Sequence, residues 1–494
     1  MKQYERFAEH MTRLLDERGI STTELARAVG FKSRNSLYRI LNDQTSSDVE
    51  QSFFNDLKAS GCLKLTPCEW ARLEESLEIS RLGVDTYVSH RAIRELLSAP
   101  PPEAGMFTCF MRGADGNVQQ KPLYAVLKEL TRGASLKLTM FNCCNAGFIR
   151  TLADELRAAA KRCQVSVTHY FFAGKGEVVR NMMATQSILY EDWYNAYMMT
   201  PGSGPQETEA LLRANTVLIH LRDAQGNERY EQMVMLDKQH IICSGMLDHQ
   251  LIGMLDGVVK DCMPQMHSVK SNFADIAHDA QDYLRYTEQY RLLEHNCAIM
   301  SLKPDVPINY IHPDILLSPV LDGFTQSNMT EEQDMHQLVS ALYNVQLKRF
   351  NNFFKKKKVT HTIFSAKAME RFVRTGKQSD HFFAIRPYTP AERKAILLNL
   401  REQAAHNPYF WVYFLKNDEA EMQAEITLYE GKGVMFMQAD TSYDLERSHN
   451  EALVNHPELN ETFKDFFMKD MLTSHVLSYQ DTMALLDHFI QMLG

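Results

Sequence analysis

A short stretch near the N-terminus, residues 33–43 with the sequence SRNSLYRILND, carries side chains that could read the edges of DNA bases. Helical spacing places Leu37 and Ile40 on an inward face. The opposite face carries the polar residues Ser33, Arg34, Asn35, Ser36 and Arg39. Arginine can make paired hydrogen bonds to guanine, asparagine can do so to adenine, and serine can donate to a phosphate or a base edge. This pattern is typical of a groove-reading helix.

Basic residues gather in the same part of the chain, although the protein as a whole is acidic. Its formal net charge of -9 at pH 7 would repel nucleic acid if it were evenly spread, so DNA binding requires a local basic surface. Between residues 18 and 42 a single acidic residue, Glu24, stands among the basic residues Arg18, Arg27, Lys32, Arg34 and Arg39. The basic charge is therefore concentrated where a DNA contact would need it.

Two predicted helices precede this stretch and would hold it in place. Apolar residues between positions 7 and 15 recur at the spacing of one helical face, and Gly19 ends this first helix. Ser21, with Glu24 three residues later, predicts a capping box that begins a second helix, which Gly30 closes. The alternative interpretation is a unit of packed helices that makes no DNA contact.

Residues 5–80 resemble the helix-turn-helix domain of Cro and phage-repressor type, also called the xenobiotic-response-element family. The ELA…G pattern of the family is matched by Glu24, Leu25, Ala26 and Gly30. Residues 33–43 match its recognition helix and the turn that follows. The sequence departs from the family in the segment FK between Gly30 and Ser33, which makes the preceding turn one residue longer.

This resemblance implies a double-stranded DNA operator as the partner. In the family, the start of the third helix contacts bases, a group near Asn42 contacts phosphate, and the protein binds paired half-sites as a homodimer. The DNA-binding residues expected on this basis are Lys32, Ser33, Arg34, Asn35, Ser36, Arg39 and Asn42.

The remainder of the chain alternates between predicted strands and helices. Strands at residues 135–141 and 164–172 flank a helix at 146–163, and this order implies an α/β sheet. Three more strands are predicted at 214–223, 228–236 and 239–246, the last two joined by a turn at Asp237 and Lys238. A weaker copy of this order is predicted at 358–365, 391–406, 409–416, 424–430, 433–439 and 460–472. The two halves suggest an internal pseudo-repeat.

The domain boundaries follow from the segment SAPPPEAG, residues 98–105, where three consecutive prolines break every regular pattern. The predicted fold class is α+β multidomain: an all-α helix-turn-helix domain is followed by an α/β body with a pseudo-duplicated module. The predicted segments are a helix-turn-helix domain (1–64), a helical connector (65–97), a linker (98–105), a first α/β half (106–264), a helical middle segment (265–350) and a second α/β half (351–494).

The doubled α/β module resembles the phospholipase D fold, whose active motif is HxKxxxxD followed by a GS pair. Tyr230 stands at the His position and Gln232 at the Lys position. Asp237 stands at the Asp position of the motif. The Cys-Ser pair that ends at Ser244 stands where the family has Gly-Ser. The reaction of that family needs an imidazole nucleophile and a cation for the phosphoryl oxygens, and a phenol and an amide supply neither. The resemblance therefore implies a cleft without catalytic activity.

Such a cleft could bind a small effector, as sensor domains of this fold do in some transcription regulators. Asn142 and Asn145, between a strand end and a helix start, could meet an anionic or hydroxyl-rich ligand beside free backbone N–H groups. The alternative is that they form a helix cap and a turn. In the second half, the nearest motif positions are Glu425, Thr427 and Lys432, which also lack histidine. The predicted ligand-binding residues are Asn142, Asn145, Tyr230, Gln232, Asp237 and Ser244.

Two further clusters allow both a functional and a structural interpretation. Tyr190, Tyr194 and Tyr197 fall on one helical face with Trp193 and could stack on a planar ligand, but core packing or a dimer contact would also explain them. The adjacent thiols of residues 143 and 144 could form a redox sensor near a helix N-terminus, or could be buried and inert.

Several protein classes are disfavoured by composition. No run approaches the roughly 18 apolar residues of a membrane-spanning helix, and MKQYERFAEH lacks the apolar region of a signal peptide. The nine cysteines include no CxxC pair and fit a reducing compartment. We therefore expect a cytoplasmic protein. No spacing matches a zinc site, a phosphate loop or a dinucleotide fingerprint, so we expect no metal and no cofactor.

These patterns together predict a sequence-specific, DNA-binding transcription regulator with a sensing body that binds a ligand or partner and has no catalytic activity. One alternative is a DNA-tethered enzyme that processes phosphodiesters or nucleotides in a defence system, although the missing His-Lys pair disfavours it. A second alternative is a protein-interaction scaffold whose N-terminal module binds a partner in place of DNA.

Overall fold

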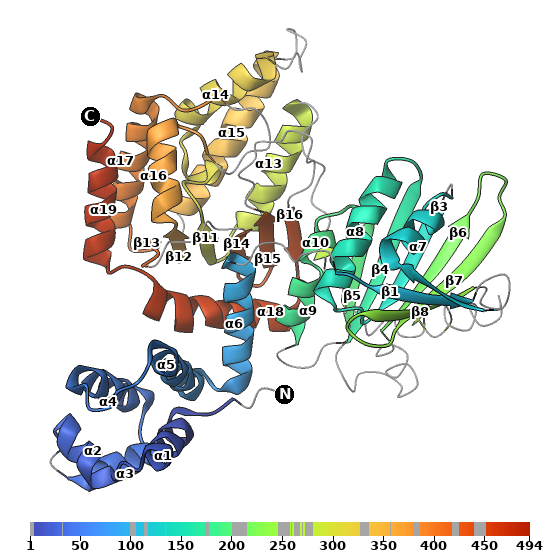
Figure 1. Ribbon diagram of the computed structural model, residues 1–494. Helices are drawn as coiled ribbons and strands as arrows, with labels where there is room; N and C mark the ends of the chain where they lie inside the picture. Colours follow the sequence, from blue (N-terminus) through green and yellow to red (C-terminus); the bar gives the residue numbers. More distant parts are fainter. Residues whose placement is uncertain are drawn as a thin grey trace. The chain divides into compact units, whose positions relative to one another are not determined.

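The protein combines an all-α N-terminal unit with an α/β unit built on two mixed sheets (Figure 1). The chain divides into two compact units, Met1–Arg91 and Ala92–Gly494. The computed structural model describes residues 4–31, 33–98, 105–112, 117–133, 135–172, 177–199, 215–245, 257, 259–260, 267–268, 270–271, 280–326, 335–355, 357–378, 386–416, 424–438 and 451–494. Among these residues, no helix is long and apolar enough to cross a membrane.

The first unit is a cluster of short helices whose ends agree with the sequence signals. Its helices are α1 (Phe7–Arg18), α2 (Thr22–Val29), α3 (Arg34–Leu41), α4 (Ser47–Ser60) and α5 (Pro67–Leu82), and α6 (Val84–Ser98) follows. The predicted capping box is confirmed: the Glu24 N–H donates to Ser21 Oγ at 3.2 Å, and the Ser21 N–H donates to Glu24 Oε2 at 3.0 Å. Gly19 and Gly30 end their helices with positive φ, as glycine allows.

The lengthened turn before α3 is anchored by an aromatic contact. Phe31 is partly buried, and its ring stacks on Phe53 of α4 with 5.7 Å between the ring centroids. Leu37 and Ile40 of α3 are 0% and 1% exposed and belong to the core shared by α1 to α5. The inward face of α3 is therefore fixed by packing, which leaves its other face to solvent.

A buried carboxyl group lies on α4. Glu50 is only 2% exposed, and its Oε1 accepts no hydrogen bond within the described residues. Burial raises the pKa of Glu50 to about 7, with a further increase from the nearby charge of Asp43. Because the ionised form is disfavoured inside a protein, this residue opposes folding wherever it must lose its proton.

We expect the stability of the first unit to fall as pH rises from about 4.5 to about 7. Glu50 binds a proton more tightly in the folded state than in the unfolded state, because its pKa is raised on folding. The stability that this proton binding contributes is fully present below the pKa of the unfolded state, and it is lost as the pH rises through the pKa of the folded state. Glu50→Gln should therefore raise the free energy of unfolding at pH 8 by about 1–3 kcal/mol. Urea unfolding at pH 5 and pH 8 measures this. Glu74→Gln, at an exposed position of α5, is the control; an equal gain there would contradict the assignment.

The first sheet of the α/β unit has the strand order β2-β1-β8-β7-β6-β3-β4-β5-β9. The strands are β1 (Thr108–Arg112), β2 (Val118–Pro122), β3 (Ser135–Phe141), β4 (Gln164–Phe172), β5 (Tyr194–Met199), β6 (Thr216–Arg222), β7 (Glu228–Met235), β8 (His240–Gly245) and β9 (His267–Ser268). The helices of this half are α7 (Leu123–Leu130), α8 (Ala146–Ala160), α9 (Val178–Ala184) and α10 (Gln186–Leu189). Strands β3, β4 and β5 run parallel, and α8 is the crossover that the sequence predicted.

The second sheet has the strand order β10-β16-β15-β14-β11-β12-β13. Its strands are β10 (Lys270–Ser271), β11 (Ile299–Lys303), β12 (Thr360–Phe364), β13 (Phe410–Phe414), β14 (Ala424–Tyr429), β15 (Gly433–Gln438) and β16 (Glu451–Val454). Its helices are α13 (Ala280–Glu294), the 3-10 helix η2 (Ile308–Tyr310), α14 (Pro313–Gln326), α15 (Met335–Phe354), α16 (Ala366–Thr375), α17 (Pro390–His406), α18 (Pro457–Asp465), the π-helix η3 (Phe466–His475) and α19 (Tyr479–Gln491). Helices α13 to α17 and α19 lie on one side of this sheet and α18 on the other (Figure 1).

The two sheets repeat one strand arrangement. The order β5-β4-β3-β6-β7-β8 in the first is matched by β13-β12-β11-β14-β15-β16 in the second, with three parallel strands followed by antiparallel ones in both. The internal repeat expected from the sequence is therefore present in strand order and direction. It also shows that β7, which carries Tyr230 and Gln232, corresponds to β15. The sequence motif matches Tyr230 and Gln232 with Glu425 and Thr427, which lie on β14. This match is wrong, because the equivalent strand of the second sheet is β15.

Two other expectations need correction. The described part of segment 265–350 is mostly helical, as expected, but it is not a separate insert, because β11 lies within it and occupies the middle of the second sheet. The aromatic residues near position 194 do not share a helical face, because β5 begins at Tyr194. Side chains three residues apart in a strand point to opposite faces, so Tyr194 and Tyr197 are separated by the sheet. Tyr194 is fully buried in the core.

Candidate functional site

Helix α3 presents the predicted polar set to solvent. Ser33, Arg34, Asn35, Ser36 and Arg39 are all exposed. Within the described residues, the guanidinium groups of Arg34 and Arg39 form no ion pair and no hydrogen bond. Both groups are therefore available to an external acceptor such as a phosphate or a guanine edge.

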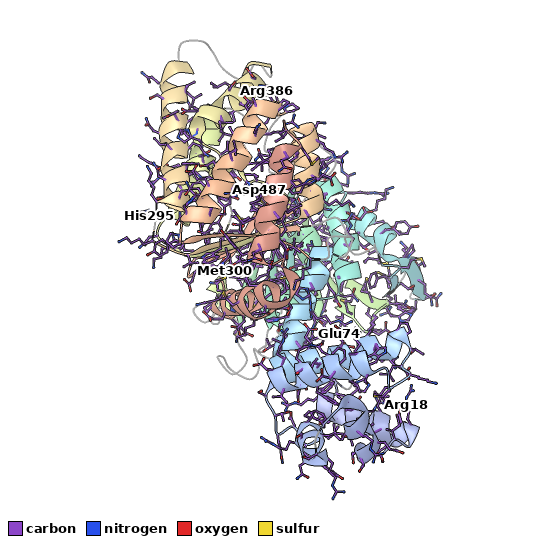
Figure 2. The ribbon with its side chains drawn as sticks, turned by 90° about the vertical axis from the view of Figure 1, so that its left-hand side faces the viewer. Arg18, Glu74, His295, Met300, Arg386 and Asp487 are labelled. Carbon is purple, nitrogen blue, oxygen red and sulfur yellow. The ribbon has the colours of Figure 1, made fainter. Side chains whose placement is uncertain are left out.

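Arg18 behaves differently, although it belongs to the same basic stretch of sequence. Its guanidinium donates to Glu69 Oε1 at 2.6 Å and to the carbonyl oxygen of Lys64 at 3.0 Å. Arg18, labelled in Figure 2, thus ties the end of α1 to the start of α5. The Arg18 contact also holds the pKa of Glu69 low, at about 2, together with hydrogen bonds from Thr66 that contribute more. Arg18 is therefore a structural residue and should be removed from the basic set.

The end of α3 contains one predicted residue and one that the sequence analysis missed. Asn42 is exposed, but its side-chain amide already donates to the carbonyl oxygen of Tyr38 at 2.7 Å, so it caps the helix. The Tyr38 side chain is 45% exposed on the face that carries Arg34 and Arg39, which makes it a further candidate for a DNA contact. An aromatic residue on an otherwise polar helix face is the sequence signal that could have identified Tyr38 as a candidate. Lys32 lies outside the described residues.

Three of the predicted ligand residues border one open hollow in the first half of the α/β unit. Asn142, Asn145 and Asp237 line this hollow of about 470 Å³ together with Glu177 and Asn181. Two of the backbone N–H groups in this region already have acceptors, however. The Asn142 N–H donates to the Tyr170 carbonyl at 2.8 Å, and Asn145 Oδ1 caps α8 by accepting from the Phe148 N–H at 3.0 Å.

The Asp237 carboxylate is engaged by its own turn. Its Oδ1 accepts from the backbone N–H groups of Gln239 at 2.7 Å and His240 at 2.9 Å, and the His240 imidazole lies 2.8 Å from Oδ2. These contacts lower the pKa of Asp237, with the Gln239 N–H as the largest cause. A carboxylate bound in this way stabilises the β7–β8 hairpin. This structural role explains why an aspartate occupies position 237, and no catalytic role is needed to explain it.

The other predicted ligand residues lie apart from this hollow. Gln232 and Ser244 are paired across β7 and β8, and the Tyr230 ring stacks on His220 with centroids 4.4 Å apart. Gln232 borders a separate cavity of about 50 Å³. The six residues therefore do not form a single site.

The adjacent cysteines lack the properties of a reactive pair. Burial raises the pKa of the Cys143 thiol, and burial raises that of Cys144 to about 12. The thiolate is the reactive form of cysteine, so both side chains are held in the unreactive thiol form at neutral pH.

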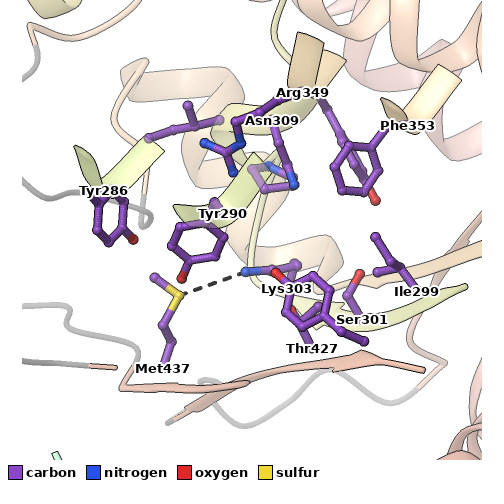
Figure 3. A pocket seen from close by; sticks show the side chains of 14 residues that line it. Tyr286, Tyr290, Ile299, Ser301, Lys303, Asn309, Arg349, Phe353, Thr427 and Met437 are labelled. Carbon is purple, nitrogen blue, oxygen red and sulfur yellow. Dashed lines mark hydrogen bonds between the residues drawn. The ribbon is translucent and has the colours of Figure 1, made fainter. Parts of the chain in front are cut away.

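One enclosed polar site in the described part of the chain was not found from the sequence. It is the pocket shown in Figure 3, in the second half, where Lys303 pairs with Glu425 at 2.6 Å and Arg349 pairs with Glu294 at 2.6 Å. The Tyr286 hydroxyl donates to Glu451 at 2.5 Å in the same region. These residues are separated by long stretches of sequence, and each lies in a segment whose local pattern indicates only a helix or strand.

Comparisons with known proteins leave the family open. No protein-family model matches the sequence, and no curated protein matches it. Among solved structures, a crystal structure of phosphatidylserine synthase from Haemophilus influenzae Rd KW20 aligns with a TM-score of 0.22 and 12% sequence identity. The alignment covers 82% of this chain and 97% of that chain. At this TM-score the likeness supports no statement about fold or function.

Proposed function

We propose that the chain is a sequence-specific, DNA-binding transcription regulator. Its N-terminal unit reads an operator through α3, and its α/β unit senses a small molecule or a partner without catalysing a reaction. The observation that carries this proposal is the exposed polar face of α3, on which Arg34 and Arg39 have no partner within the described residues. A helix held by buried Leu37 and Ile40 can offer these groups as one rigid surface.

The start of α3 is suited to a phosphate contact. Ser33 occupies the N-cap position, but its side chain makes no capping hydrogen bond within the described part of the chain. The first backbone N–H groups of a helix lack partners inside the helix and attract anions through the helix dipole. A DNA phosphate at this end would orient α3, while Arg34 and Asn35 could reach base edges.

Paired half-sites and a homodimer complete the proposal. A helix of this length covers only a few base pairs, and regulators with this type of domain read two half-sites through two copies. A ligand of the α/β unit would alter operator affinity if it favoured one arrangement of the paired N-terminal units.

Arg34→Ala should lower the affinity for an operator fragment by about 1–3 kcal/mol, which corresponds to roughly 5- to 150-fold in Kd. The change removes a side chain that can pair with guanine and should also relax the sequence preference. Fluorescence anisotropy at fixed salt, with a fragment selected by the wild-type protein from a random pool, measures the effect. Arg72→Ala is the matched control, because Arg72 is an exposed arginine of the same unit that belongs to α5 and not to α3. Equal affinities for the wild type and Arg34→Ala would exclude α3 as the reading helix.

A further inference from the structure

A row of sulfur-containing side chains crosses three neighbouring strands of the first sheet. In the parallel pair of β1 and β8, Met111 lies opposite Cys243. In the antiparallel pair of β8 and β7, Cys243 lies opposite Met233. Neighbouring strands are about 4.7–4.9 Å apart, and residues opposite one another project from the same face of the sheet. The short side chain of Cys243 therefore stands between two long, flexible methionine side chains.

The three side chains border one enclosed cavity. Met233 is 2% exposed and Cys243 is 6% exposed, and Met111 is partly buried against the same core. Together with Val126 and Leu130 of α7 they line a cavity of about 50 Å³. One ordered water needs roughly 10–15 Å³ on the same measure, so the cavity has room for a single ion beside the sulfur atoms.

A second thiol lies beside the row. Cys109 precedes Met111 by two residues on β1, which places its side chain on the same face, and it is 0% exposed. A hydrogen bond between the thiols of Cys109 and Cys243 lowers the pKa of Cys109 and raises that of Cys243. The two thiols are thus in contact, and the Cys109 S–H can donate to the Cys243 sulfur once that sulfur is ionised.

The charged residues around the cavity are already balanced. Glu231, which is 5% exposed and lies two residues before Met233, pairs with Arg229. Glu129 of α7 pairs with Lys121 at 3.0 Å. Both acidic residues that line the cavity therefore have a basic partner, and the cavity favours an occupant that is uncharged once it is bound.

The sulfur donors determine which cation fits these requirements. Thioethers and thiolates are soft ligands that select Cu(I), whereas Mg²⁺ and Ca²⁺ prefer oxygen and structural Zn²⁺ prefers four thiolate or imidazole ligands. One thiolate and two neutral thioethers cancel a single positive charge. A monovalent soft cation would therefore form an uncharged complex, while a divalent cation would leave a buried positive charge.

We propose that Met111, Cys243 and Met233 bind one Cu(I) ion in this cavity. The Cys243 thiol releases its proton to solvent, and its sulfur binds copper in place of that proton. The two methionine sulfurs complete a three-coordinate site, and the Cys109 thiol donates a hydrogen bond to the Cys243 thiolate.

This site differs from the expectation that the chain holds no metal. That expectation compared spacings along the sequence, whereas strand pairing is what brings positions 111, 233 and 243 together. The proposal concerns the first half of the α/β unit and does not rest on DNA binding by the N-terminal unit.

Competition for Cu(I) with the coloured chelator bicinchoninate, in ascorbate and without oxygen, tests the site in the full chain. We expect one copper per chain to be held against excess chelator, with one proton released per copper. Met111→Leu with Met233→Leu removes both thioethers at nearly constant volume and should weaken binding of this ion at least tenfold. Met140→Leu with Met198→Leu is the matched control and should leave the affinity unchanged. These two methionines are 0% and 1% exposed in the same core, and neither lines the cavity.

Several results would overturn the proposal. If the wild type retains no copper against the chelator, or if the Met111→Leu, Met233→Leu variant retains it equally well, the site is excluded. Release of two protons per copper would contradict a single thiolate ligand, and displacement of copper by equimolar Zn(II) would contradict the choice of cation. If the double variant does not fold, as judged by circular dichroism, Cys243→Ala provides the decisive measurement. It removes the thiolate, and unchanged copper affinity in that variant would also reject the site.

Discussion

Arg349→Met should destabilise the α/β unit by about 3–5 kcal/mol, because it would leave the carboxylate of Glu294 buried without its partner. Arg349 and Glu294 are 7% and 0% exposed at the side chain, and two hydrogen bonds join them. The Glu294 carboxylate would keep the hydrogen bond from the Asn309 side-chain amide at 3.1 Å, but it would lose the counter-charge that offsets its lost hydration. Urea unfolding followed by circular dichroism gives the change in free energy.

Two controls separate this effect from a general effect of arginine replacement. Combining Arg349→Met with Glu294→Gln should restore much of the lost stability, because the uncompensated charge is then absent. Arg374→Met removes one partner of the exposed pair with Glu370 and should change the stability by less than about 1 kcal/mol. A loss from Arg349→Met no larger than that from Arg374→Met would show that the Arg349–Glu294 pair does not stabilise the fold.

Leu37→Ala should destabilise the N-terminal unit by about 2–5 kcal/mol, the range typical of a large buried side chain replaced by alanine. Leu37 is 0% exposed and packs in the core that α1 to α5 share. The variant should also bind DNA more weakly, because the packing of Leu37 sets the position of α3. Thermal unfolding of the N-terminal unit and a DNA titration below its melting temperature measure the two effects.

Tyr38→Ala is the control for stability, because it changes the neighbouring residue on the exposed face of the same helix. We expect it to alter the free energy of unfolding by less than about 1 kcal/mol. Equal stability of Leu37→Ala and Tyr38→Ala would mean that α3 is not held by its inward face.

Features encoded by neighbouring residues could be predicted from the sequence. The capping box at Ser21 and Glu24, the helix end at Gly19 and the strand at Ser135–Phe141 all follow from local hydrogen bonding, backbone freedom and side-chain spacing. The exposure of Arg34 and Arg39 was predictable for the same reason, since helical periodicity assigns each residue to a face.

Features that depend on distant residues could not be predicted. β11 is short and lies between helices, and only its pairing with β12 and β14 makes it a strand. The enclosed polar pocket of the second half joins residues from α13, β11, α15 and β14, and no local pattern relates Lys303 to Arg349. The predicted ligand set failed to form one site because residues aligned with a linear motif can lie on different parts of a sheet. Tyr194 was assigned to a helical face because aromatic spacing alone cannot distinguish a helix from the start of a buried strand.

The most direct test of DNA reading by α3 is sequencing of the DNA fragments that the purified full-length protein retains from a random pool. We expect the wild type to enrich one motif in two copies with a fixed spacing. Replacing Arg34 and Arg39 together by alanine should abolish this enrichment, while Arg72→Ala should leave it unchanged. Enrichment of the same motif by the doubly substituted protein, or no enrichment by the wild type, would contradict the proposed function.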